Sequence, residues 1–315
     1  MPVDPAIQPI LDAVAAAPAP DPTLPIEALR ANAHRMMELS FVALAEPGPE
    51  VASVVDKAVP VDGGEITVRV YTPFGAVPHP AHVYFHGGGF WLGTLDHFDS
   101  SCRELCIGAA CVVVSVDYRL APEYKFPTAP EDCYTALCWV VQHADALGID
   151  PGRVSVGGGS AGGNLATVVA LMARDRGGPP LVFQVVEIPV TDLTMSHGSI
   201  LENGEGYLLT RSAMEQCRSF YIEDELDLEN PYASPFFADD LSGLPPALVM
   251  TAEFDPLRDE GEAYAQRLAD AGVPTRQKRW IGHIHGAAAF TSILPSAREY
   301  RSEVIAALRE AYATA

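Results

Sequence analysis

Ser160 occupies a position at which a serine can act as a nucleophile. It lies in the segment GGSAG (residues 158–162), which fits Gly-x-Ser-x-Gly, follows the β-branched run 154–156 and precedes the helix-forming residues 165–173. A serine on such a sharp turn projects out of a sheet, and glycine neighbours tolerate the backbone angles that the turn requires. The free N–H groups of the helix would face an oxyanion. The pattern indicates acyl transfer.

The same glycines fit two other interpretations. Residues 157–162 also match Gly-x-Gly-x-x-Gly, the loop that binds a dinucleotide between a strand and a helix. Glu187, at the end of the next apolar run, would then bind the ribose, and the protein would be an oxidoreductase. The third interpretation is a turn without chemistry. A non-catalytic receptor for a small ligand on the same fold is a further alternative.

A nucleophilic serine needs a histidine base and an acid that orients it. In hydrolases of this architecture the chain order is serine, then acid, then histidine. Two histidines lie in GHIHG (residues 282–286), directly after the last predicted strand. If this segment is extended, His283 and His285 share one face while Ile284 points away. Both are therefore candidate bases, as is His197 by its place in the chain. The candidate acids follow the run 247–252: Glu253, Asp255 and Asp259.

A glycine triplet follows His86 at the end of a short apolar run, residues 81–85. Folding rarely needs three glycines at a strand end, but they let backbone N–H groups approach a substrate oxygen closely. These N–H groups, with that of Ala161 after the serine, would then stabilise an oxyanion. The alternative is a flexible turn.

Alternating strands and helices must position these groups. Apolar runs predict strands at residues 81–85, 111–116, 154–156, 181–188, 247–252 and 275–280, with a hairpin at 59–71. Helices are expected at residues 131–142, 165–173, 259–271 and 296–312. This alternation predicts an α/β fold with a mainly parallel central sheet flanked by helices.

Two segments stand outside the alternation. Residues 4–17 and 25–44 predict two amphipathic helices, joined by a stiff linker that contains Pro18, Pro20 and Pro22. Short helices are marginal alone, so this arm must lie on the body of the protein, as a lid or by simple packing. Residues 192–222 predict an insertion of loop and helix. We therefore divide the chain into an N-terminal helical segment (1–50) and a domain (51–315) that carries the insertion.

Composition limits the class of protein. The chain has 315 residues, 48% of them hydrophobic, and a formal net charge of −21, which argues against nucleic acids and anionic membranes as partners. No run of 18 apolar residues predicts a membrane span, and Asp4 lies where a signal peptide carries positive charge. These features predict a cytoplasmic protein. Cys102 and Cys106 lack a matching downstream pair, so no metal site is expected.

The motifs taken together resemble a known family. HGGGF (86–90), DYRLAPE (117–123), GGSAGGNLA (158–166), DPLRD (255–259) and HG (285–286) match the bacterial hormone-sensitive-lipase-like esterases in order and spacing. The resemblance implies an α/β-hydrolase fold with a helical cap, hydrolysis of short- to medium-chain carboxylic esters, and neither metal nor cofactor. Family members often form dimers, so it also allows a homodimer.

The resemblance also assigns roles to residues. It makes Ser160 the nucleophile, His285 the base and Asp255 the acid that orients it. It implies that the oxyanion donors are Gly88, Gly89 and Ala161, and that His86, Arg119 and Glu123 support the site loops. The cap would comprise residues 1–50 and 192–222, and we expect the substrate pocket to include Phe90, Tyr207, Leu208, Leu209 and Ile284.

Three positions depart from the family pattern. Gly159 stands where most relatives carry Asp or Thr, Ala287 where they carry Phe, and His283 where an apolar residue is more common. None of these changes removes a group that the expected chemistry needs.

Overall fold

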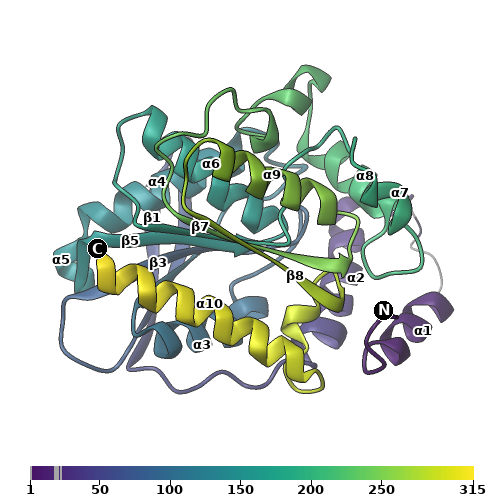
Figure 1. Ribbon diagram of the computed structural model, residues 1–315, viewed down its shortest axis with the longest axis horizontal. Coiled ribbons are helices and arrows are strands. Elements are labelled where there is room, and N and C mark those ends of the chain that lie inside the picture. The colour runs from purple at the N-terminus through teal and green to yellow at the C-terminus, as the bar shows by residue number, and fades with distance from the viewer. Residues whose placement is uncertain (1, 18–20, 22) are drawn as a thin grey trace.

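The computed structural model describes residues 2–17, 21 and 23–315. Its centre is an eight-stranded sheet in the order β1-β2-β4-β3-β5-β6-β7-β8 (Figure 1). The hairpin of β1 (Ser53–Val61) and β2 (Gly64–Thr72) joins the sheet antiparallel to β4, and all other neighbouring strands are parallel. These are β3 (His79–Phe85), β4 (Val112–Asp117), β5 (Ile149–Gly159), β6 (Phe183–Glu187), β7 (Ala247–Phe254) and β8 (Thr275–Ile284). The predicted mainly parallel sheet is confirmed.

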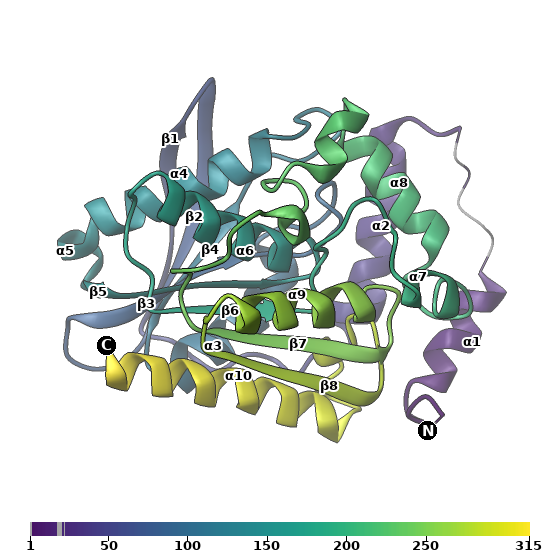
Figure 2. The same cartoon turned by 45° about the horizontal axis from the view of Figure 1, so that its top comes forward.

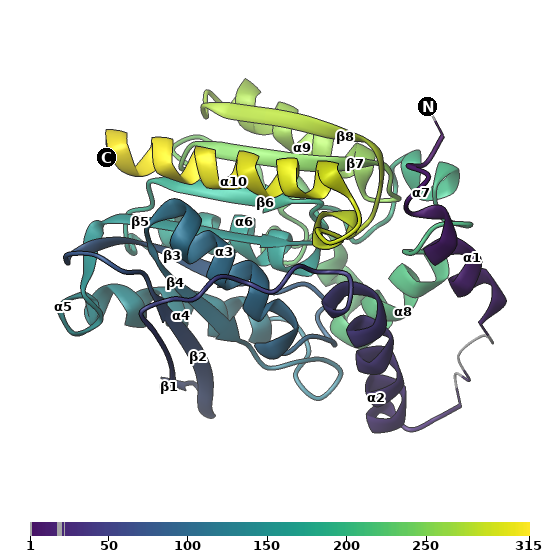
Figure 3. The same ribbon diagram turned by 90° about the horizontal axis from the view of Figure 1, so that it is seen from below.

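Helices cover both faces of the sheet, which explains why every residue of β3 and β6 is buried. One core cluster joins the sheet to α4 (Thr128–Gln142), α6 (Ala161–Asp175) and α9 (Arg258–Asp270), with the short α5 (Ala144–Leu147) beside them. The other joins it to α3 (Asp99–Ala109) and α10 (Pro295–Thr314), as Figure 3 shows from below. The strand and helix runs named from the sequence leave out α3, although its buried residues Cys102, Leu105, Cys106 and Ala109 follow helical spacing.

Four further helices gather at one end of the sheet (Figure 2). They are α1 (Gln8–Ala16), α2 (Ile26–Met37), α7 (Ser199–Glu202) and α8 (Arg211–Tyr221), and a π-helical turn (Glu38–Val42) extends α2. The linker prolines Pro18, Pro20 and Pro22 lie outside the described residues. Within the part of the chain that the structure describes, no helix is both long and apolar enough to span a membrane.

Separate contacts fix the two N-terminal helices. Ile7 and Leu11 pack with Ile284 and Phe290, and the Asp4 N–H donates to the carbonyl of Gly282. These contacts attach α1 to the end of β8 and the loop that follows it.

The second helix, α2, is fixed by Arg30. Its guanidinium bridges to both carboxylate oxygens of Glu123, at 2.8 and 2.6 Å, and donates to the carbonyls of Trp91 and Ala121. The N-terminal arm therefore lies on the body of the protein at both of its helices.

Candidate active site

Ser160 lies on a strained turn between β5 and α6. Its backbone has φ 59° and ψ −119°, a combination that residues other than glycine rarely adopt. The Ser160 N–H donates to the carbonyl of Glu187 at 2.9 Å, which anchors the turn to β6. A Cβ on Gly158 or Gly162 would overlap the carbonyl oxygen of Phe85, so only glycine fits at both positions. The serine therefore lies between the end of β5 and the start of α6, where it lines a cavity.

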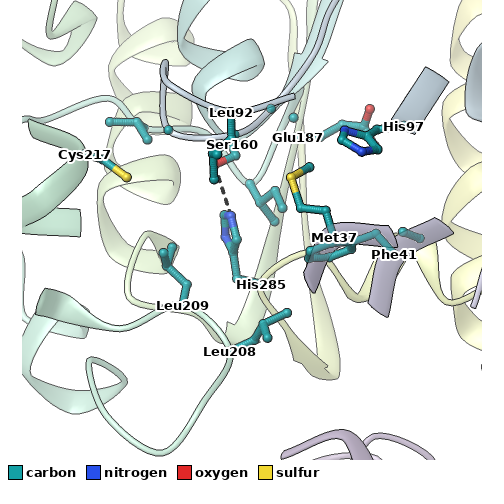
Figure 4. Close-up of a pocket in the computed structure, with 18 of the residues that line it drawn as sticks. Met37, Phe41, Leu92, His97, Ser160, Glu187, Leu208, Leu209, Cys217 and His285 are labelled. Atoms are coloured by element: carbon teal, nitrogen blue, oxygen red, sulfur yellow. Dashed lines mark hydrogen bonds between the residues drawn. The ribbon is translucent and has the colours of Figure 1, made fainter. Parts of the chain in front are cut away.

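A continuous chain of hydrogen bonds leads from Ser160 to Asp255. His285 Nε2 lies 3.0 Å from Ser160 Oγ, and His285 Nδ1 lies 2.8 Å from Asp255 Oδ2 (Figure 4). The other carboxylate oxygen of Asp255 accepts the Leu257 N–H at 2.9 Å, and the residue is fully buried. This arrangement is able to remove a proton from the serine and to orient the base.

The other candidate bases lie elsewhere. His283 Nε2 is 2.8 Å from Ser296 Oγ, its ring lies between Trp280 and Tyr300, and burial lowers its pKa to about 4. The expectation that His283 and His285 share a face is wrong, because β8 ends at Ile284 and the chain turns at His285 and Gly286.

His197 is also excluded by its position, since its Nε2 lies 3.5 Å from the Asp192 carboxylate. The alternative acids serve other contacts. Glu253 Oε2 accepts the Gly282 N–H at 2.7 Å, and Asp259 Oδ2 accepts the Ser199 N–H at 2.8 Å. Of the three candidate acids, Asp255 alone hydrogen-bonds a candidate base.

The glycine loop passes beside the serine. Gly88 and Gly89 have φ 126° and 60°, and a Cβ would overlap Leu92 at the first position and the Cys217 sulfur of α8 at the second. A Cβ on Gly87 would lie 3.6 Å from that of Ser160. Ala161 is the first residue of α6, so its N–H has no acceptor within the helix. The glycine loop and the first turn of α6 thus both lie beside Ser160.

The three residues expected to support the site loops make different contacts. The His86 ring stacks on Tyr118 at 4.3 Å between centroids, its Nδ1 lies 2.9 Å from the Gly87 carbonyl, and burial lowers its pKa to about 4. Arg119 pairs with the buried Asp132 at 2.7 Å. Glu123 pairs with Arg30 of α2 at 2.6 Å.

A cavity of about 400 Å³ opens over Ser160 and His285. Its wall includes Phe90, Leu208 and Leu209, as expected. The prediction that Tyr207 and Ile284 line the pocket is wrong. Tyr207 packs against Phe254 at 5.2 Å, and Ile284 is buried in the cluster around Ile7, because each points into the packing between α1 and the end of β8.

Other wall residues have no signal in the sequence. Figure 4 shows Ser160 and His285 between Cys217 and Leu209 on one side and Met37, Phe41 and His97 on the other. Phe41, from the turn after α2, occupies the space in which a side chain on Gly286 would lie. These residues reach the pocket only through tertiary contacts between distant segments, which sequence spacing does not reveal.

The sheet, the strained serine turn and the histidine and aspartate at later strand ends define the class of the protein: it is an α/β hydrolase. Residues 82–289 match the family described as alpha/beta hydrolase fold, in agreement with this class.

Individual relatives narrow the class. Esterase LipI of Mycobacterium tuberculosis is 40% identical over 312 residues, which cover 98% of this chain and 94% of that protein. An arylesterase of Saccharolobus solfataricus is 42% identical over 246 residues, covering 78% of this chain and 80% of that protein. The structure of the esterase from Pyrobaculum calidifontis aligns with a TM-score of 0.94 at 44% identity, covering 98% and 99% of the two chains.

The chain belongs to the hormone-sensitive-lipase-like carboxylesterases, a family of carboxylic ester hydrolases. The resemblance inferred from the motifs is confirmed. The matches favour the nucleophile interpretation of residues 157–162 over a dinucleotide-binding loop.

Proposed function

We propose that the protein hydrolyses carboxylic esters through an acyl-enzyme formed on Ser160, with His285 as base and Asp255 as its orienting acid. The hydrogen-bond chain of 3.0 and 2.8 Å that joins these side chains is the observation that carries the proposal. The strained backbone of Ser160 supports it, because such strain is typical of functional sites.

The reaction follows from this geometry. His285 Nε2 accepts the proton of Ser160 Oγ as the oxygen attacks the ester carbonyl carbon, and Asp255 stabilises the imidazolium. The imidazolium then protonates the leaving alcohol, and the acyl group remains on Oγ. Water, deprotonated by His285, attacks the acyl-enzyme and releases the acid.

The oxyanion formed at each attack would accept hydrogen bonds from the N–H groups of Gly88, Gly89 and Ala161. One donor of this kind typically lowers the barrier by about 3 kcal/mol. The backbone of Gly88 and Gly89 supports this role. Both residues have positive φ and closely approach Leu92 and Cys217, so the loop carries no side chain there that would cover its N–H groups.

We further propose that residues 1–50 and 192–222 act as a cap on the hydrolase domain formed by the rest of residues 51–315. Both segments contribute to the cavity wall, through Met37 and Phe41 in the first and Leu209 and Cys217 in the second. A cavity of about 400 Å³ lies near the lower end of the range for small-molecule sites, which favours short to medium acyl chains.

Substitution of the nucleophile tests the proposal. We expect purified protein to hydrolyse p-nitrophenyl esters from acetate to octanoate, and Ser160→Ala to lower kcat by roughly 10⁴-fold or more. His285→Gln should be similarly inactive, whereas His283→Gln, a matched change two residues away, should retain activity. An inactive wild-type protein would indicate a receptor, and full activity in Ser160→Ala would contradict the assigned nucleophile.

A further inference from the structure

One wall of the cavity is polar, although no residue in it takes part in the proposed triad. Arg301 of α10, Glu187 of β6 and Ser101 of α3 line the cavity beside Ser160. Arg301 is 8% exposed and Glu187 is 6% exposed, so both charged groups are largely removed from water. Charged side chains are rarely buried to this extent without a partner or a function.

The hydrogen bonds of Arg301 are incomplete. Nη2 donates to Ser101 Oγ at 3.1 Å, and Nε lies 3.3 Å from Glu104 Oε2. Nη1 is buried and has no hydrogen-bond partner among the described residues. A buried charged donor without an acceptor is costly, so a ligand oxygen at this position would be stabilised.

Glu187 provides an acceptor on the same wall. The backbone carbonyl of Glu187 accepts the Ser160 N–H at 2.9 Å, so the backbones of the two residues are in direct contact. In Figure 4 it lies on the side of Ser160 away from Cys217. Burial raises the pKa of the Glu187 carboxyl, although Arg301 and a hydrogen bond from Tyr300 act to lower it. Both charged groups line the same cavity, and among the described residues they form no direct ion pair with each other.

We propose that Arg301, Ser101 and Glu187 form a subsite that selects ester substrates carrying a hydroxyl group. The hydroxyl oxygen accepts a hydrogen bond from Arg301 Nη1, and its hydrogen is donated to the Glu187 carboxylate. The inference rests on ester hydrolysis at Ser160 and adds a preference among esters.

The charges around the subsite distinguish this ligand from two others. A carboxylate would be attracted by Arg301 but repelled by Glu187 and Glu104, whose side chains face the same guanidinium. An alkyl chain would exclude water from Arg301 Nη1 without providing an acceptor. A neutral hydroxyl is both a donor and an acceptor, so it matches the donor Arg301 Nη1 and the acceptor Glu187 carboxylate.

The test compares hydroxylated esters with unsubstituted ones at equal chain length. One set carries the hydroxyl in the acyl part (methyl 4-hydroxybutanoate and 6-hydroxyhexanoate), and the other carries it in the alcohol part (2-hydroxyethyl and 4-hydroxybutyl butanoate). Monomethyl succinate and monomethyl adipate are the carboxylate probes. We expect kcat/KM of the wild-type protein to be about tenfold higher for the hydroxylated members of one set, as expected for a hydrogen bond to a charged group. The set that shows the preference identifies which part of the ester the subsite binds.

Variants then assign the preference to residues. Arg301→Met, which keeps a long unbranched side chain, should bring the ratio of hydroxylated to unsubstituted kcat/KM close to one. Glu187→Gln, which keeps the shape but replaces the carboxylate by a weaker, neutral acceptor, should lower this ratio. Leu209→Ala, on the opposite wall, should alter chain-length preference but leave this ratio unchanged. If Arg301→Met fails to fold, Glu187→Gln and Ser101→Ala decide the question.

The outcomes separate the two proposals. Failure to cleave the unsubstituted esters would contradict ester hydrolysis itself. Cleavage of these esters with no preference in the wild-type protein, a preference for the carboxylate probes, or a preference that is unchanged in the variants would overturn the hydroxyl subsite.

Discussion

At the scale of single residues, the two glycines before Ser160 lie in different surroundings. A Cβ on Gly158 would overlap the Phe85 carbonyl, whereas a Cβ on Gly159 would lie 3.9 Å from the Cβ of Glu187. The structure thus requires glycine at the first position and has room for a side chain at the second.

This contrast predicts opposite effects of the same substitution. Gly158→Ala should lower the free energy of unfolding by about 3 kcal/mol, because the backbone of β3 must move. Gly159→Ala should raise it by about 0.5 kcal/mol, since alanine reduces the conformational entropy of the unfolded chain. Urea unfolding of both variants measures the two values. Equal destabilisation at both positions would contradict the difference in space.

The sequence allows the proposed triad to be predicted because each of its members follows a strand end in a fixed chain order. Ser160, Asp255 and His285 are marked by local motifs, and the structure brings them together. The tertiary wall residues are not predictable in this way, because Arg301 lies within a helix whose pattern shows only periodicity. Ile284 is misplaced for a similar reason, since Ile7 and Leu11 of α1, which bury it, lie far from it in the chain.

At the scale of elements, Arg30 makes the charged contacts that attach α2 to the body, beside the apolar packing of Ile26, Leu29 and Ala33. Arg30 makes its four hydrogen bonds to Glu123 and to two backbone carbonyls of the loop that follows β3 and of the segment after β4. The next arginine on the helix, Arg35, is exposed, and its side-chain partner among the described residues is Asn32, at 3.5 Å. Arg30 is therefore the anchoring arginine of α2, and Arg35 is a matched control for its substitution.

Loss of the anchor should loosen α2 without unfolding the domain. We expect Arg30→Met to lower the local opening free energy of residues 26–42 by about 2 kcal/mol, since it removes hydrogen bonds to a charged group. Hydrogen exchange should then be roughly 30-fold faster in α2 and unchanged in α6. KM for octanoate esters should rise, because Met37 and Phe41 form part of the wall. Arg35→Met should leave both measurements unchanged, and equal effects of the two variants would argue against the anchor.

The elements themselves differ in how well the sequence predicts them. Buried parallel strands such as β4 are nearly continuous apolar runs, so their existence follows directly from composition. The order of the hairpin strands and the placement of α2 and α8 over the pocket depend on contacts such as Arg30 to Glu123, which join residues far apart in the chain. Such contacts carry no local signal.

At the scale of the whole molecule, buried neutral histidines link stability to pH. Burial lowers the pKa of His82 to about 3 and of His86 and His283 to about 4, below the value near 6.5 of an unfolded chain. Between these limits the unfolded chain binds more protons than the folded one, so the free energy of unfolding falls as the pH falls.

His283 isolates one such contribution, because it lies outside the proposed triad. We expect the difference in unfolding free energy between wild type and His283→Gln to change by about 3 kcal/mol between pH 7 and pH 4, with the variant favoured at low pH. Denaturant unfolding at several pH values measures this difference. Parallel stability curves for the two proteins would show that His283 does not titrate as its burial implies.

The contacts between the N-terminal helix and the end of β8 have a consequence for the order in which the protein is synthesised. Ile7 and Leu11 leave the ribosome long before Ile284 and Phe290, against which they pack. The apolar side of α1 must therefore remain without its docking surface during most of translation. The loop that carries His285 obtains its support from α1 only when the last strand has emerged, so the nascent chain should acquire its activity late and in a single step.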